Sequence, residues 1–183
     1  MSTERIDPNN DVDHQPKNRL DAIMFKLGNL GSGLFMMTVA ISFYEIVMRY
    51  AFNAPTIWVH ETATFVGGAL FVLGGSYALA TNRHVRVVLL YDYVSDRTRI
   101  FLNIFHHIMG LIFTALMVYA SYFMAKDSFF TPWGDMRLET SGSAWDPSFP
   151  AYTKALILII FVIMFFQFLL HLFQELVSLR GRK

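Results

Sequence analysis

The chain has 183 residues, 54% of them hydrophobic, and a formal net charge of +1. So small a charge does not favour nucleic acid as a partner, and the absence of cysteine excludes disulfides, thiolate metal sites and cysteine nucleophiles. Because apolar segments and their flanks use nearly all of the length, we expect no room for a separate catalytic domain.

Residues 1–16 are polar and contain no apolar core of a signal peptide, so we expect a disordered cytoplasmic tail. Residues 17–30 carry apolar side chains at helical spacing with charges elsewhere around the helix, namely Leu20, Ile23, Met24 and Leu27. Two alternatives remain open for this segment. It forms an amphipathic helix on the membrane surface, or it is an extension of the first span.

Four stretches are long, apolar and poor in charge, and a helix needs about 20 such residues to cross a bilayer. They predict a membrane domain over residues 17–183 with spans at about 27–48, 58–82, 99–125 and 151–176. The predicted fold is an all-α integral membrane protein with four transmembrane helices. Amphipathic interfacial helices are expected before the first span and between the second and third, the latter with a basic side that faces lipid headgroups.

Basic residues gather on one side of this predicted topology. Most of them precede the first span, separate the second from the third, or follow the fourth: Arg5, Lys17, Arg19, Lys26, Arg83, Arg86, Arg97, Arg99, Arg180, Arg182 and Lys183. Such a bias marks the cytoplasmic side, so both termini are expected in the cytoplasm. Residues 49–57 and 126–154 then form the outer connections, and the second of these is expected to be an ordered loop on the outer interface.

Three charged residues flank the first outer connection. Glu45 precedes Arg49 by four residues, which places them on one helix face, and Glu61 falls in the first turn of the next helix. The three could form a proton or ion site, since ionisable groups near membrane depth are often functional. We favour the alternative, a salt-bridge cluster that fixes the hairpin, because the charges balance locally near the headgroups.

Small residues in the second span predict close helix packing. Gly67, Gly74 and Ala78 share one helix face, so this span is the candidate central packing helix. In the third and fourth spans, a rise of about 1.5 Å per residue puts His107 and Gln167 at similar depth. We therefore predict contact there, with His107 hydrogen-bonded to Gln167 or His171.

Residues 49–61, RYAFNAPTIWVHE, resemble the pattern RYxFNxPxxWxxE. That pattern marks the small, DctQ-like membrane subunit of tripartite ATP-independent periplasmic (TRAP) transporters. The positions matched here are Arg49, Tyr50, Asn53, Pro55, Trp58 and Glu61. Arg83, His84 and Arg86 resemble the family's second motif, HVRVD, although Val88 stands where an acid is usual. The segment with Glu139, Trp145 and Pro147 looks like the region before the family's fourth span.

The resemblance implies a division of labour in the bacterial inner membrane. A periplasmic binding protein captures a solute, often an organic acid, and a large sodium-coupled membrane subunit moves it inwards. The small subunit, without a cofactor of its own, is expected to scaffold the large one through its outer hairpin, and residues 126–154 are expected to help receive the binding protein. The sequence does not identify the solute.

Two other classes of function compete with this interpretation. Histidines at His60, His106, His107 and His171 suggest a redox or quinone-linked membrane anchor. However, adjacent His106 and His107 point about 100° apart on a helix and cannot bind one metal from the same face. A self-assembling channel would need a polar face over the full membrane depth, and the third span approaches this only in part. The sequence contains no nucleophile elbow, phosphate-binding loop or dinucleotide motif, so we do not expect an enzyme.

Overall fold

The computed structural model describes residues 18–81 and 96–181. Its helices are α1 (Arg19–Ala51), α2 (Ile57–Ala80), α4 (Asp96–Phe129) and α5 (Phe149–Gly181). Each is long and apolar enough to cross a membrane. The predicted all-α architecture with four membrane-length helices is therefore confirmed.

Helix α1 extends further towards the N-terminus than the predicted first span. It runs without interruption from Arg19 to Ala51, so the described part of the segment before the span is an extension of α1 and not a separate interfacial helix. The physical reason is that no proline occurs between Asn18 and Pro55 to interrupt the backbone hydrogen bonds. The second predicted interfacial helix, with Arg83, His84 and Arg86, lies outside the described residues.

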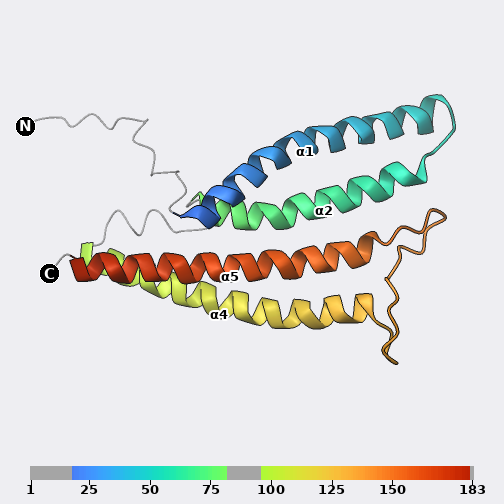
Figure 1. Cartoon of the computed structure of the whole chain (residues 1–183). Coiled ribbons are helices and arrows are strands. Elements are labelled where there is room, and N and C mark those ends of the chain that lie inside the picture. Colours follow the sequence, from blue (N-terminus) through green and yellow to red (C-terminus); the bar gives the residue numbers. More distant parts are fainter. Residues whose placement is uncertain (1–17, 82–95, 182–183) are drawn as a thin grey trace, which may run out of the picture.

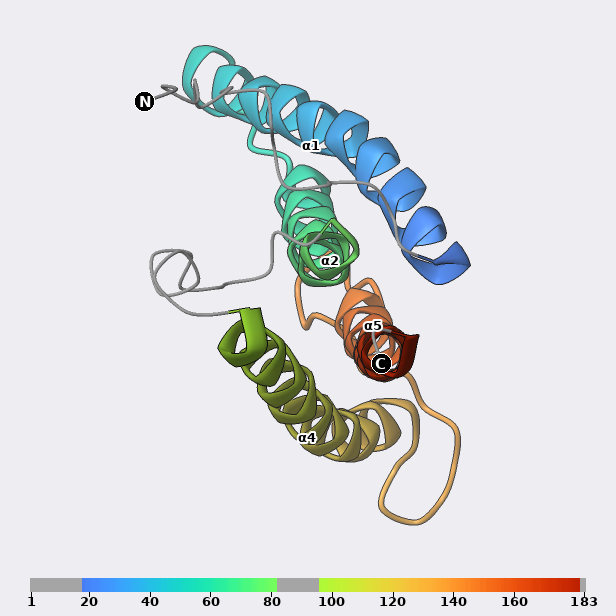
Figure 2. The same ribbon diagram turned by 90° about the vertical axis from the view of Figure 1, so that its left-hand side faces the viewer.

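The helices form a single layer in the order α1, α2, α5, α4 (Figures 1 and 2). Sequential hairpins pair α1 with α2 and α4 with α5, and α2 packs on α5 to join them. Figure 2 shows α2 and α5 nearly end-on, whereas α1 and α4 run obliquely at the two edges. The start of α1 and the end of α5 lie at one end of the layer, and both hairpin connections lie at the other (Figure 1).

The apolar core is small and sits where the two hairpins meet. It comprises Leu79 from α2 with Ile160, Met164 and Phe168 from α5. The layer leaves large apolar side chains exposed on both edge helices, such as Phe35, Phe43, Phe101 and Leu116. In a bilayer these side chains face lipid or a partner, because hydrocarbon is as apolar as they are.

Close helix approach occurs at other glycines than those predicted. A Cβ on Gly28 of α1 would lie 2.1 Å from the Tyr77 ring, and one on Gly110 of α4 would lie 2.3 Å from the Phe168 ring. In contrast, a Cβ on Gly67 or Gly74 would meet no described atom within 4 Å. These two glycines therefore do not mark a close approach of α2 to another described helix, and their role in helix packing stays a prediction.

Candidate functional site

Four buried polar side chains from α1, α2 and α5 form a network at the end of the layer where α1 begins. We call Asp21, Ser76, Gln167 and His171 the polar network. Ser76 Oγ donates to Gln167 Oε1 at 2.7 Å, and Gln167 Nε2 donates to Asp21 Oδ1 at 2.9 Å. The second carboxylate oxygen of Asp21 lies 2.7 Å from His171 Nε2. At 0% to 4% exposure, these groups are removed from water.

Local helix geometry positions each member. Asn18 caps α1 by accepting the Asp21 amide at 2.9 Å, so the Asp21 carboxylate stands in the first turn, where the helix dipole favours negative charge. Gln167 and His171 are four residues apart on α5 and therefore share a face. Ser76 faces them from α2, which lies between α1 and α5 in the layer.

The predicted contact between the third and fourth spans is present, but its hydrogen-bond partners differ. His107 is 4% exposed, and its ring centroid lies 5.8 Å from that of His171 in an edge-on arrangement. Gln167 and His171 direct their hydrogen bonds to Ser76 and Asp21. The histidine pair is thus a packing contact beside the polar network.

Asp21 is the site residue that sequence reasoning missed. The sequence pattern places Asp21 only among the charges that lie away from the apolar stripe of residues 17–30. The signal that could have found it is the stripe Asp21, Met24, Gly28, Gly31, in which an acid continues the small and apolar residues that contact α2. An acid on the packing face of a membrane helix predicts a polar partner inside the protein.

The network suits a structural role better than a catalytic one. The Gln167 amide and the His171 imidazole both contact the Asp21 carboxylate, so the buried acid has a partner for each oxygen. Buried hydroxyls elsewhere in the layer bond to their own helix, as Thr114 and Ser121 do with carbonyl oxygens one turn earlier. The polar network, in contrast, links α1, α2 and α5 to one another.

A second polar cluster closes the α1–α2 turn, residues 52–56. Glu45 is 8% exposed and accepts from Arg49 Nη2 at 2.6 Å and from the Thr56 amide at 2.9 Å, while the Thr56 hydroxyl also donates to it. Because Thr56 is the N-cap residue of α2, Glu45 supplies the helix start with an acceptor from the neighbouring helix. Asn53 allows the turn by adopting a φ of 50°, which asparagine tolerates better than most residues.

The structure brings together some of the predicted hairpin residues and not others. Glu45 and Arg49 form the predicted ion pair, but Glu61 lies outside it, and Thr56 takes the place expected for Glu61. Trp58 packs against Tyr44 with ring centroids 6.4 Å apart. Pro55 and Tyr50 are exposed.

The α4–α5 loop, residues 130–148, meets the turn at an open cleft of about 610 Å³. Its lining comes from both connections: Pro55, Thr56, Ile57, Trp58, Ala144 and Trp145. Trp145 is half exposed and packs edge-on against Phe149 at the start of α5. Pro147 supports the loop because its carbonyl accepts the Ser141 amide at 3.1 Å.

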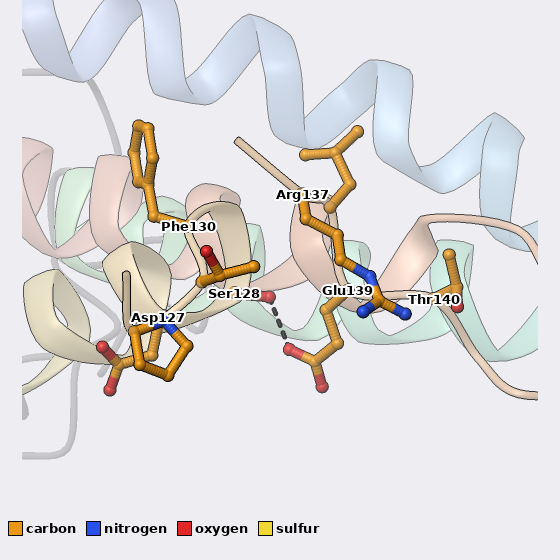
Figure 3. A pocket seen from close by; sticks show the side chains of 9 residues that line it. Asp127, Ser128, Phe130, Arg137, Glu139 and Thr140 are labelled. Atoms are coloured by element: carbon orange, nitrogen blue, oxygen red, sulfur yellow. Dashed lines mark hydrogen bonds between the residues drawn. The ribbon is translucent and has the colours of Figure 1, made fainter. Parts of the chain in front are cut away.

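Glu139 fastens the loop to both of its flanking helices. Ser128 at the end of α4 donates to its carboxylate at 2.5 Å, as Figure 3 shows, and Lys154 on α5 forms an ion pair with it. The hydrogen bond from Lys154, and to a smaller extent the one from Ser128, holds the pKa of Glu139 below its ordinary value of 4.5. A cavity of about 360 Å³ lies beside this contact, with Asp127 and Arg137 in its wall.

Taken together, the long apolar helices and the polar clusters that tie them define a small multi-pass membrane protein. The family described as "Tripartite ATP-independent periplasmic transporters, DctQ component" matches residues 38–178, and the chain belongs to this family. It is thus a component of a TRAP transporter, located in the inner membrane.

One relative is similar over part of its length. A stretch of 93 residues, 51% of this chain, is 28% identical to the sialic acid TRAP transporter permease protein SiaT of Haemophilus influenzae (strain 86-028NP). That stretch covers 15% of SiaT, so the chain matches a minor part of that relative.

Proposed function

We propose that this chain is the non-catalytic small membrane subunit that scaffolds the large, sodium-coupled subunit of a TRAP transporter. The large subunit would carry Na⁺ and the solute, and this chain would need no cofactor. The solute would be an organic acid or a similar small molecule delivered by a periplasmic binding protein.

The observation that carries the proposal is the single layer of membrane-length helices fixed by buried polar contacts. A carrier places mobile polar groups near the bilayer midplane. In the described helices, the buried polar network is engaged with its own members, and Glu45 and Arg49 sit at the far end of α1. A flat layer with exposed apolar faces offers a wide surface to a larger membrane protein.

We propose further that both ends of the chain are cytoplasmic, which follows from the distribution of basic residues. The turn and the α4–α5 loop would then face the periplasm, since both lie at the opposite end of the layer (Figure 1). Their shared cleft and the half-exposed Trp145 supply a surface on which the binding protein would dock.

Co-expression of the tagged chain with the large subunit tests the proposal. We expect the two to co-purify, and we expect proteoliposomes to take up solute when both subunits and the loaded binding protein are present. Solute flux into liposomes that hold this chain alone would contradict the scaffold role, as would full transport by the large subunit without it.

The redox-anchor alternative is not favoured. Membership in a transporter family argues against it, and Nε2 of His171, one of the four candidate histidines, is engaged with Asp21. A Soret band in the spectrum of the purified protein would revive this alternative.

A further inference from the structure

Helix α1 has few buried residues for its length. Of its 33 residues, the buried ones are Asp21, Met24, Gly31 and Glu45. Its main neighbour is α2, because it stands at the edge of the layer. Crossing angles of helix pairs scatter by about 15–20° even within one packing class, so apolar contact with a single neighbour leaves the angle of α1 poorly determined.

The polar network adds a contact that packing on α2 does not supply. Through Asp21, the first turn of α1 reaches past α2 to two side chains of α5, Gln167 at 2.9 Å and His171 at 2.7 Å. Ser76 of α2 joins the same network through Gln167. Three helices are therefore fixed relative to one another at one point, and water does not compete because Asp21 is 0% exposed.

The contact between Asp21 and His171 is directional. One proton lies between Nε2 and the carboxylate oxygen, whichever group carries it. The next ring beyond His171 is His107 of α4, whose centroid is 5.8 Å away. A displacement of α1 would therefore break a buried hydrogen bond and leave polar atoms without partners in an apolar layer.

We infer that Asp21 and His171 are positioning residues that fix the angle of α1 against α2 and α5, and with it the shape of the face on which the large subunit packs. The part that concerns the large subunit rests on the proposed function. The part that concerns α1 is a property of this chain alone.

Spin-label distances test the first part, and the natural absence of cysteine makes labelling clean. Labels at Ile23→Cys and Phe173→Cys report on the first turns of α1 and the facing end of α5, because both side chains are exposed, at 53% and 65%. The full chain is placed in lipid nanodiscs as Asp21→Ala, His171→Ala and Asp21→Asn. The matched control is Thr114→Val, since Thr114 is equally buried but bonds within α4.

We expect one narrow distance distribution for the parent and for Thr114→Val. Asp21→Ala and His171→Ala should shift this distance distribution or widen it about two-fold, because the angle between α1 and α2 is then free to vary over the range usual for packed helices. Asp21→Asn should keep the parent distribution, because an amide can accept from Gln167 and donate to the other tautomer of His171. An unchanged distribution in Asp21→Ala would overturn the inference, and so would equal widening in Thr114→Val.

Co-purification with the large subunit tests the second part. We expect Asp21→Ala and His171→Ala to retain several-fold less of the large subunit than the parent, and Asp21→Asn to retain as much as the parent. Failure of the parent to retain the large subunit would count against the proposed function itself. Retention by the parent together with undiminished retention by Asp21→Ala would refute only the inference about the angle of α1.

Discussion

Replacing Gln167 by leucine tests how much the polar network contributes to stability, because Gln167 joins the neutral Ser76 to the acidic Asp21. The side chains are similar in size, so the substitution removes the hydrogen bonds of the Gln167 side chain to Ser76 and to Asp21 while leaving little cavity. On the Ser76 side we expect a loss of about 0.6 kcal/mol, the average for hydrogen bonds between membrane helices. On the Asp21 side the lost bond goes to a buried acid, and such bonds contribute about 1.5–3 kcal/mol. The free energy of unfolding should therefore fall by about 2–3.5 kcal/mol in Gln167→Leu.

The control is Ser76→Ala, which removes the neutral bond alone and should cost about 0.6 kcal/mol. The double variant should be nearly as stable as Gln167→Leu, because both changes remove the same Ser76–Gln167 bond. Unfolding in mixed micelles, followed by far-ultraviolet circular dichroism, measures all three. If Gln167→Leu lies within about 0.5 kcal/mol of the parent, the amide does not support the Asp21 carboxylate and our account of the network is wrong.

Three further predictions concern other parts of the layer. Gly110→Ala should destabilise the chain by about 1–3 kcal/mol through overpacking, whereas Gly74→Ala, which meets open space, should be nearly neutral in the same unfolding assay. Acidification should release the α4–α5 loop. Because the pKa of Glu139 is lowered, the contact of its carboxylate stabilises the loop above pH 4.5 and is lost as the pH falls through the pKa in the folded chain. The fluorescence of the loop tryptophans should report this change in the parent and should not report it in Glu139→Gln. Glu45→Ala should speed hydrogen exchange of the Thr56 amide, and unchanged exchange would show that this amide does not depend on the carboxylate.

The membrane-length helices could be predicted from sequence because apolar length reports directly on the hydrocarbon that they cross. Their neighbours could not, since an apolar face suits lipid and protein equally. This is why Gly67 and Gly74 were assigned to helix packing while the close approaches occur at Gly28 and Gly110.

The hydrogen-bond partners of the polar side chains could likewise be predicted from sequence only in part. Depth along the spans correctly placed His107 beside α5, but the partner of His171 depends on how α1 crosses α2, which residue spacing does not encode. At the other end, Glu61 was expected beside Arg49, yet Thr56 bonds to Glu45 because an N-cap amide stands closer to α1 than a side chain one turn further along α2.

The two acids buried on α1 explain how an edge helix with few buried contacts keeps a defined place. At about 1.5 Å per residue, Asp21 and Glu45 are separated by a rise of about 36 Å, slightly more than the hydrocarbon thickness of about 30 Å. Each carboxylate therefore stands near a border of the bilayer, where a charge costs less than at the centre, and each bonds to another helix, Asp21 to α5 and Glu45 to the start of α2. Two bonds so far apart restrict tilt more strongly than the same bonds placed together at mid-membrane would. A helix held at both borders and apolar between them can serve as a rigid strut while the faces of the layer stay free for lipid and for the large subunit.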